Sequence, residues 1–243
     1  MRRLAWIPAL VLIIAAWQAW IELRSVPDYI APAPSDIGRA LWDERSTLAS
    51  QVAVTAREML AGFAAAVAGG LAAAIVLHQV RWLRGAVYPL LVASQSIPIV
   101  AVAPLLVIGL GFGLAPKVAI VALVCFLPVT VNALDGFASA PADLRRTMRT
   151  LNASPRSIFW RVELPWAAPR IFSGVRIAAA YAAIAALFGE YAGGSGGLAD
   201  SMHDQLDTGL VGAGVVLLAC LALALFAAVV VLERVTVPWA RDG

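Results

Sequence analysis

The sequence predicts an all-α membrane protein with about six transmembrane helices, and three observations carry that prediction. The first is composition: 61% of the 243 residues are hydrophobic and 14% are charged, whereas soluble domains carry about 25% charged residues. The second is a set of six long apolar runs, and the third is that arginines gather in alternate connections between them. The same composition excludes disordered, collagen-like and disulfide-scaffold proteins.

The six apolar runs are long enough to cross a bilayer, which requires roughly 20 residues of helix. One run, from Gly85 to Pro116, is too long for one straight span, and its Gly-Leu-Gly-Phe-Gly stretch at 109–113 predicts a turn that shortens it. The predicted spans are Leu4–Leu23, Met59–Leu77, Val87–Leu110, Val118–Leu134, Ile171–Ala192 and Leu210–Leu232. We treat residues 1–243 as one transmembrane domain.

The positions of the basic residues predict the orientation, because cytoplasmic connections retain positive charge. With both termini inside, 13 of the 18 basic residues fall in inner segments. The outer segments hold Arg24, Arg39, Arg45, Arg57 and Lys117. This places a multi-pass chain in a bacterial cytoplasmic (inner) membrane. A cleavable signal peptide over the first run is an alternative, which Trp17, Trp20 and the continuation of the run to Leu23 disfavour.

Small residues recur at every fourth position in two of the runs. The first ladder is Gly62, Ala66, Gly70 and Ala74, and the second is Gly174, Ala178, Ala182 and Ala186. Such ladders allow helix backbones to approach closely. We interpret them as packing faces within one bundle.

The largest inner segment, residues 136–170, has the local chemistry of a helix-turn-helix. Pro141 and Asp143 suit a first helical turn, and Asn152 tolerates the left-handed conformation that ends helices. Ser154 then supplies an N-cap for a second helix, which Leu164-Pro165 should stop. Ile158, Phe159 and Val162 give this second helix an apolar side. A structured pair of helices is more than topology requires, and we expect it to meet a cytoplasmic partner or membrane lipid headgroups through Arg145, Arg146, Arg149 and Arg156.

This segment carries a resemblance to a known family. Asn152, nine residues, and then Val162-Glu-Leu-Pro165 resembles the cytoplasmic loop signature of permease subunits of bacterial ATP-binding cassette (ABC) importers. The similarity extends from about Pro32 to Trp239 and is greatest to the nitrate, sulfonate and taurine group. The matching segments are Ser96-Ile-Pro98, Ala103-Pro-Leu105, Gly109–Gly113, Leu127-Pro128, Phe172–Ile177 and Gly189-Glu-Tyr191. Arg146-Thr-Met148 stands where the family has Glu-Ala-Ala, and Asn152 replaces a glycine.

The resemblance implies the six-helix fold of type I importer permeases and a defined set of partners. These are a second permease copy, two ATPase subunits that bind ATP and Mg²⁺, and an extracytoplasmic substrate-binding protein. The implied ATPase-coupling residues are Arg146, Met148, Asn152, Ala153, Ser154, Phe159, Val162, Leu164 and Pro165. Arginine in place of glutamate reverses a charge expected at the ATPase contact.

The chain itself is not expected to be an enzyme. A phosphate-binding P-loop requires Gly-Lys-[Ser/Thr], and the only lysine, Lys117, lies between Pro116 and Val118. Gly193-Gly-Ser-Gly196 matches the motif of rhomboid proteases, but His203 is only eight residues from Ser195 and His78 lies at the opposite membrane face. Two separated histidines and two lone cysteines predict no metal site. We expect no cofactor in this chain.

Polar residues inside the predicted spans are candidates for a substrate path, because they are costly in lipid. Glu190 continues the second ladder of small residues, and Gln95 and Ser96 interrupt the third span just before Pro98. An interfacial role is the alternative for Glu190. The predicted path comprises Gln95, Ser96, Pro98, Asn132, Tyr181 and Glu190. A secondary transporter would also use broken helices and a membrane carboxylate, but the chain is short and shows no half-to-half repeat.

The substrate class is the least determined feature. An ionised Glu190 would repel nitrate or a sulfonate, which favours a neutral or weakly basic heteroaromatic solute. Phe188-Gly-Glu-Tyr191 and Asp207-Thr208 also resemble members thought to carry thiamine pyrimidine precursors or riboflavin. Nitrate, sulfonate and taurine remain the alternatives.

Overall fold

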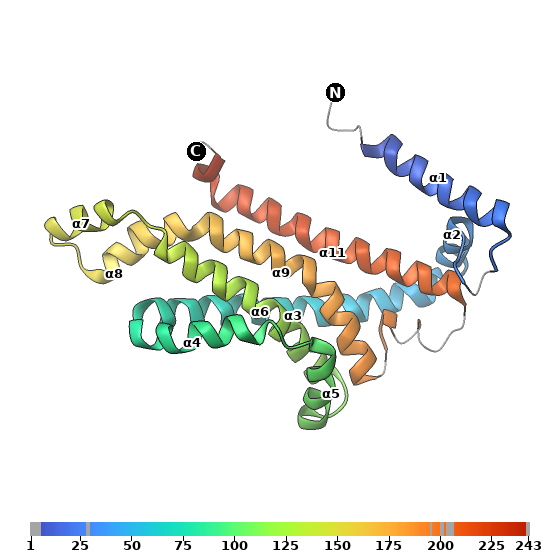
Figure 1. Cartoon of the computed structure of the whole chain (residues 1–243), viewed down its shortest axis with the longest axis horizontal. Helices are drawn as coiled ribbons and strands as arrows, with labels where there is room; N and C mark the ends of the chain where they lie inside the picture. The colour runs from blue at the N-terminus through green and yellow to red at the C-terminus, as the bar shows by residue number, and fades with distance from the viewer. Residues whose placement is uncertain (1–5, 28–29, 195, 200–201, 203–206, 242–243) are drawn as a thin grey trace.

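The computed structural model describes residues 6–27, 30–194, 196–199, 202 and 207–241, and every regular element in these ranges is a helix. The elements are α1 (Trp6–Arg24), α2 (Pro34–Asp43), α3 (Arg45–Gln79), α4 (Arg81–Ser94), α5 (Ile99–Leu110), α6 (Leu114–Ala138), α7 (Ala142–Thr150), α8 (Pro155–Ile158), η2 (Phe159–Glu163), α9 (Leu164–Gly193), α11 (Thr208–Thr236) and η3 (Pro238–Arg241). In Figure 1 the long helices form one elongated bundle with α7 and α8 at one end, here called the loop end, and α2 at the far end.

Four helical segments in the described part of the chain are long and apolar enough to cross a membrane: α3, α6, α8 to α9, and α11. They contain the predicted spans Met59–Leu77, Val118–Leu134, Ile171–Ala192 and Leu210–Leu232. The bent pair α4 and α5 raises the number to five if it is one span. The predicted run Leu4–Leu23 corresponds to α1, apart from residues 4–5, which lie outside the described residues. The total of six stays a prediction.

The predicted single helix over Val87–Leu110 is wrong, because α4 and α5 meet at an angle of 106°. Pro98 has no N–H and adopts an extended conformation as the N-cap of α5. The preceding residues close four-residue turns, in which Ile97 N donates to Ser94 O at 3.1 Å. The glycine turn predicted at 109–113 is confirmed, since Gly111 and Gly113 have φ values of 79° and 112°.

The core lies where α6 packs between α3 and α9. Both ladders of small residues face α6 and are buried, which confirms their role in packing. A Cβ on Gly62 would lie 2.5 Å from Val121 Cβ, and one on Gly174 would lie 2.6 Å from Pro128 O. These contacts require glycine, because any side chain would force the helices apart.

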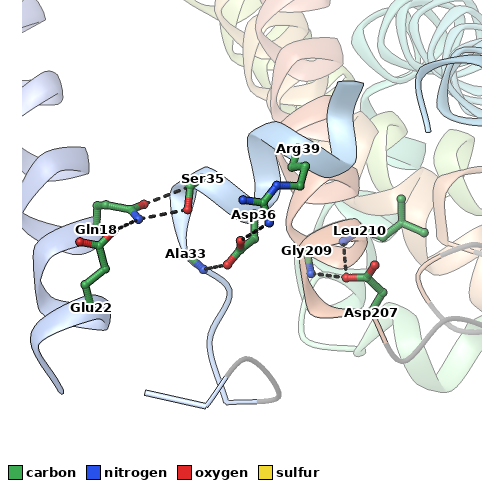
Figure 2. Close-up of polar contacts among 9 residues, drawn as sticks. All are labelled: Gln18, Glu22, Ala33, Ser35, Asp36, Arg39, Asp207, Gly209 and Leu210. Carbon is green, nitrogen blue, oxygen red and sulfur yellow. Dashed lines mark hydrogen bonds and ion pairs between the residues drawn. The ribbon is translucent and has the colours of Figure 1, made fainter. Parts of the chain in front are cut away.

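The far end is organised around α2, which joins α1 to α11 (Figure 2). Gln18 on α1 donates to Ser35 Oγ and accepts from Ser35 N, both at 3.0 Å. Asp207 caps α11 by accepting from Gly209 N at 2.8 Å. Ile37 on the apolar face of α2 packs in the cluster that includes Leu210. In Figure 1, α1 stands apart from the other long helices.

The loop end contains the predicted helix-turn-helix, with one correction. Asn152 adopts the left-handed conformation at φ 57°, and Ser154 Oγ accepts from Ser157 N at 3.2 Å, as predicted. Leu164-Pro165 does not stop the second helix. Instead α8 passes through the π-helical turn η2 into α9, and Leu164 N donates to Phe159 O. The proline is tolerated because it lies in the first turn of α9.

Candidate functional site

The break between α4 and α5 forms one wall of a cavity of about 560 Å³. α6 and α9 supply the opposite wall. The lining residues are Ser94, Gln95, Ile97, Pro98, Ile99, Val102, Leu123, Val124, Leu127, Pro128 and Tyr181. None of them is charged, so the cavity offers apolar surface with a phenol, an amide and a hydroxyl as its polar side chains. Such a composition suits a neutral small molecule.

Three of the predicted path residues, Gln95, Pro98 and Tyr181, therefore meet at one cavity, although Tyr181 is far from the other two in the sequence. Ser96 lies in the same turn as Gln95 but is not among the lining residues. Asn132 is elsewhere: its Nδ2 donates to Pro128 O at 2.8 Å, in the close contact between α6 and α9 at Gly174. Its position indicates a packing role.

Glu190 does not line this cavity, and its place on a substrate path stays a prediction. Its side chain is buried, and it accepts from Thr55 Oγ1 at 2.5 Å and from Ala199 N at 2.7 Å. Gly197, at φ 109°, passes so close to the carboxylate that a Cβ there would overlap it. Glu190 therefore holds the segment 196–199 that leads from α9 towards α11.

A second buried charge contact lies beside Glu190. Lys117 Nζ is 3.0 Å from Glu58 Oε1, and the two side chains are 1% and 4% exposed. Lys117 Nζ also donates to Gly196 O at 3.1 Å, and Leu198 N donates to Thr55 Oγ1 at 3.0 Å. We call Thr55, Glu58, Lys117 and Glu190 the far-end cluster. It fastens segment 196–199 to α3, α6 and α9.

Sequence reasoning missed most of the far-end cluster and placed Lys117 in an outer connecting segment, whereas the structure buries its side chain in the first turn of α6. A signal was present, because Glu58 lies four residues before Gly62 and so continues the first ladder, as Glu190 continues the second. Both carboxylates are thereby placed on faces that pack against α6. Lys117 begins the apolar part of α6, where a buried cation requires an acidic partner.

At the loop end the predicted coupling residues divide into exposed and buried groups. Arg146, Asn152 and Ser154 are exposed, and Met148 and Ala153 are partly exposed. Phe159 and Val162 are buried instead, with the Phe159 ring 5.3 Å from that of Phe137. Leu164 and Pro165 lie half-buried in the first turn of α9. The expectation that the apolar side of the second helix faces a partner is therefore corrected, because that side packs on the bundle.

A polar contact connects this loop to the bundle. His78 Nε2 at the end of α3 lies 2.9 Å from Glu163 Oε2 in η2, and Arg145 Nη1 of α7 lies 3.6 Å from Glu163 Oε1. His78 is thus at the loop end, as predicted. Ser195 and His203 of the weighed protease motif lie outside the described residues.

Comparison with known proteins connects these features to a family. Residues 65–239 match the family model described as "Binding-protein-dependent transport system inner membrane component". The chain is 34% identical to the riboflavin transport system permease protein RibX of Chloroflexus aurantiacus, over 95% of this chain and 88% of the relative. It is 32% identical to the formylaminopyrimidine transport permease protein ThiX of Halalkalibacterium halodurans, over 95% and 94%. Identity to the taurine transport system permease protein TauC of Escherichia coli is 27%, over 96% and 88%.

Proposed function

Because this chain belongs to the family of inner membrane components of binding-protein-dependent transport systems, the permeases of ABC importers, we propose that it forms a homodimer that imports a heteroaromatic solute. Two partner ATPases supply the energy by hydrolysing ATP with Mg²⁺, and an extracytoplasmic binding protein delivers the solute. As a permease subunit, the chain has no ATPase site of its own. The loop end faces the cytoplasm, where the positive charge of the connections is retained.

The proposed substrate class is supported by one observation, the uncharged cavity between the α4–α5 break, α6 and α9. Tyr181 offers an aromatic ring and Gln95 an amide, which suit a planar solute with hydrogen-bonding edges. An anion would find no cation among the lining residues, and burial of an unpaired charge is costly. The uncharged lining, rather than Glu190, therefore favours this substrate class. The names of two relatives, for riboflavin and formylaminopyrimidine transport, agree with it.

The coupling surface consists of the exposed turn at the loop end. Asn152 reverses the chain between α7 and α8, and Arg146 and Ser154 flank this turn on the surface. Arg146 Nη1 lies 3.6 Å from Asp143 Oδ1, but both side chains are exposed, so this ion pair is weak. The Arg146 guanidinium is therefore available to an acidic group on the ATPase. The buried residues Phe159 and Val162 then transmit movement of the loop to the bundle.

Two measurements test the proposal. Native mass spectrometry of the partner binding protein should show a bound heteroaromatic molecule, and a tightly bound nitrate, taurine or sulfonate would overturn the substrate class. Vesicles that contain the chain and its ATPase should take up that ligand only with ATP and binding protein. Uptake driven by an ion gradient in vesicles without the ATPase would instead show a secondary transporter.

A further inference from the structure

A second cavity, of about 460 Å³, lies at the loop end, and Arg146 is the one lining residue that also belongs to the coupling surface proposed above. It is formed where the end of α3, the start of α4, the connection from α6 to α7, and η2 come together. Its lining residues are His78, Arg84, Ala138, Ala142, Arg145, Arg146, Arg149 and Glu163. We call it the arginine cavity.

The arginine cavity carries more positive charge than its own carboxylate neutralises. Glu163 is the one acidic lining residue, and it is already in contact with His78 and Arg145. Within the part of the chain that the structure describes, no carboxylate lies within ion-pair distance of Arg84 or Arg149. The Arg84 guanidinium lies over the ring of Tyr88, 5.9 Å from its centroid. Guanidinium groups gathered in this way match the oxygens of a phosphate group.

The position of the arginine cavity distinguishes a lipid from a soluble anion. Trp82 beside Arg84 is 76% exposed, and Leu90 further along α4 is 68% exposed. An exposed tryptophan and an arginine at the start of an apolar helix are typical of the boundary between headgroups and hydrocarbon. A phosphate in the cavity would therefore be at headgroup depth, with exposed apolar surface of α4 alongside for acyl chains.

We propose that the arginine cavity binds the phosphate headgroup of an anionic phospholipid, whose acyl chains lie along α4. Basic pockets between helices on the cytoplasmic side of membrane proteins bind such headgroups. The bound phosphate joins α4 to α7, so the lipid holds the exposed turn at Asn152 in place against the bundle.

The test uses the full chain in detergent after its bound lipid has been removed. The chain is titrated with phosphatidylglycerol or with phosphatidylethanolamine of identical acyl chains, and native mass spectrometry counts the bound lipid. Phosphatidylglycerol should bind at least tenfold more tightly. Substitution of Arg84→Gln together with Arg149→Gln should weaken it about tenfold or more, since each surface arginine contributes about 1 kcal/mol to binding of anionic lipid. The matched control, Arg156→Gln with Arg161→Gln, removes two exposed arginines at the same end that do not line the cavity; it should change binding less than twofold.

Equal weakening by both pairs, or equal affinity for the two lipids, would overturn the proposal. Displacement of phosphatidylglycerol by millimolar inorganic phosphate would show a soluble-ion site, and displacement by the ATPase would show a contact with protein carboxylates. Crosslinking of the wild-type chain with a photoactivatable phosphatidylglycerol headgroup keeps the test independent of variant folding. Crosslinks should fall within residues 81–94 and 138–150, and a majority on α9 or α11 would also overturn it.

Discussion

Lys117 and Glu58 form an ion pair of 3.0 Å in which both side chains are almost completely withdrawn from solvent. The two residues come from α6 and α3, and Lys117 also donates to Gly196 O. A buried pair of this kind is costly to break, because the remaining charge loses its compensation. The far end of the bundle therefore depends on both members being present.

The first prediction follows from this ion pair. Lys117→Met should lower the free energy of unfolding by about 3–5 kcal/mol, because it leaves the Glu58 carboxylate buried without its cation. Glu58→Gln should also destabilise the protein. The double variant should lose less than the sum of the two single losses, since its second change removes a contact already broken. Unfolding in detergent followed by circular dichroism measures all three, and additive losses would contradict the coupling.

The second prediction concerns Glu190, whose carboxylate accepts from Thr55 Oγ1 and Ala199 N. Glu190→Gln removes the negative charge and one of the two acceptor oxygens, so the hydrogen bonds to Thr55 and to Ala199 N become weaker. Hydrogen exchange of the amides in segment 196–199 should become faster, with exchange in α11 unchanged. Glu233→Gln, which alters a carboxylate paired with Arg176, serves as the control. Unchanged exchange in segment 196–199 would contradict the fastening role of Glu190.

The third prediction compares two glycines in helices. A Cβ on Gly62 would lie 2.5 Å from Val121 Cβ, whereas a Cβ on Gly85 would meet nothing within 4 Å. Gly62→Ala should therefore destabilise the bundle by about 1–3 kcal/mol through overpacking. Gly85→Ala should be neutral or stabilise it by up to about 1 kcal/mol through helix propensity. Equal melting temperatures for the two variants would show that α3 and α6 are not in close contact.

The fourth prediction concerns the uncharged cavity. Tyr181→Ala removes the only aromatic ring among its lining residues and should lower ATP-dependent uptake by about tenfold, the effect of losing roughly 1.4 kcal/mol of transition-state stabilisation. Ile184→Ala changes an exposed residue of the same helix that does not line the cavity. Uptake by this control should stay within twofold of wild type. A similar loss in both variants would remove the cavity from the transport path.

The fifth prediction concerns coupling at Asn152. Asn152→Pro cannot adopt φ 57° and removes the N–H that donates to Arg149 O at 3.0 Å, so the turn between α7 and α8 should be lost. Glycine adopts this conformation readily, and Asn152→Gly should retain transport. In vesicles with the ATPase and binding protein, the proline variant should hydrolyse ATP without uptake. Normal uptake by this variant would show that the turn is not a coupling element.

The features predicted correctly from the sequence are those with a local cause. The span in α6 follows from the length of its apolar run, and the left-handed Asn152 and the Ser154 cap follow from the conformational and hydrogen-bonding preferences of single residues. The ladder from Gly62 predicted a packing face because helical periodicity specifies which residues share a side.

The partner that each of these helix faces meets is visible only in the folded chain. Periodicity marks Phe159 as apolar, but it does not say whether the bundle or another subunit covers that ring, and here Phe137 does. Glu190 was recognised as costly in lipid, yet its partner Thr55 is 135 residues away, and Lys117 meets Glu58 across 59 residues. The 106° angle between α4 and α5 at Pro98 is likewise seen only in the structure, where α5 packs against α6 and α9. Local patterns in the sequence specify a helical membrane protein and most of its turns, whereas the burial and pairing of its polar residues depend on contacts between helices distant in the chain.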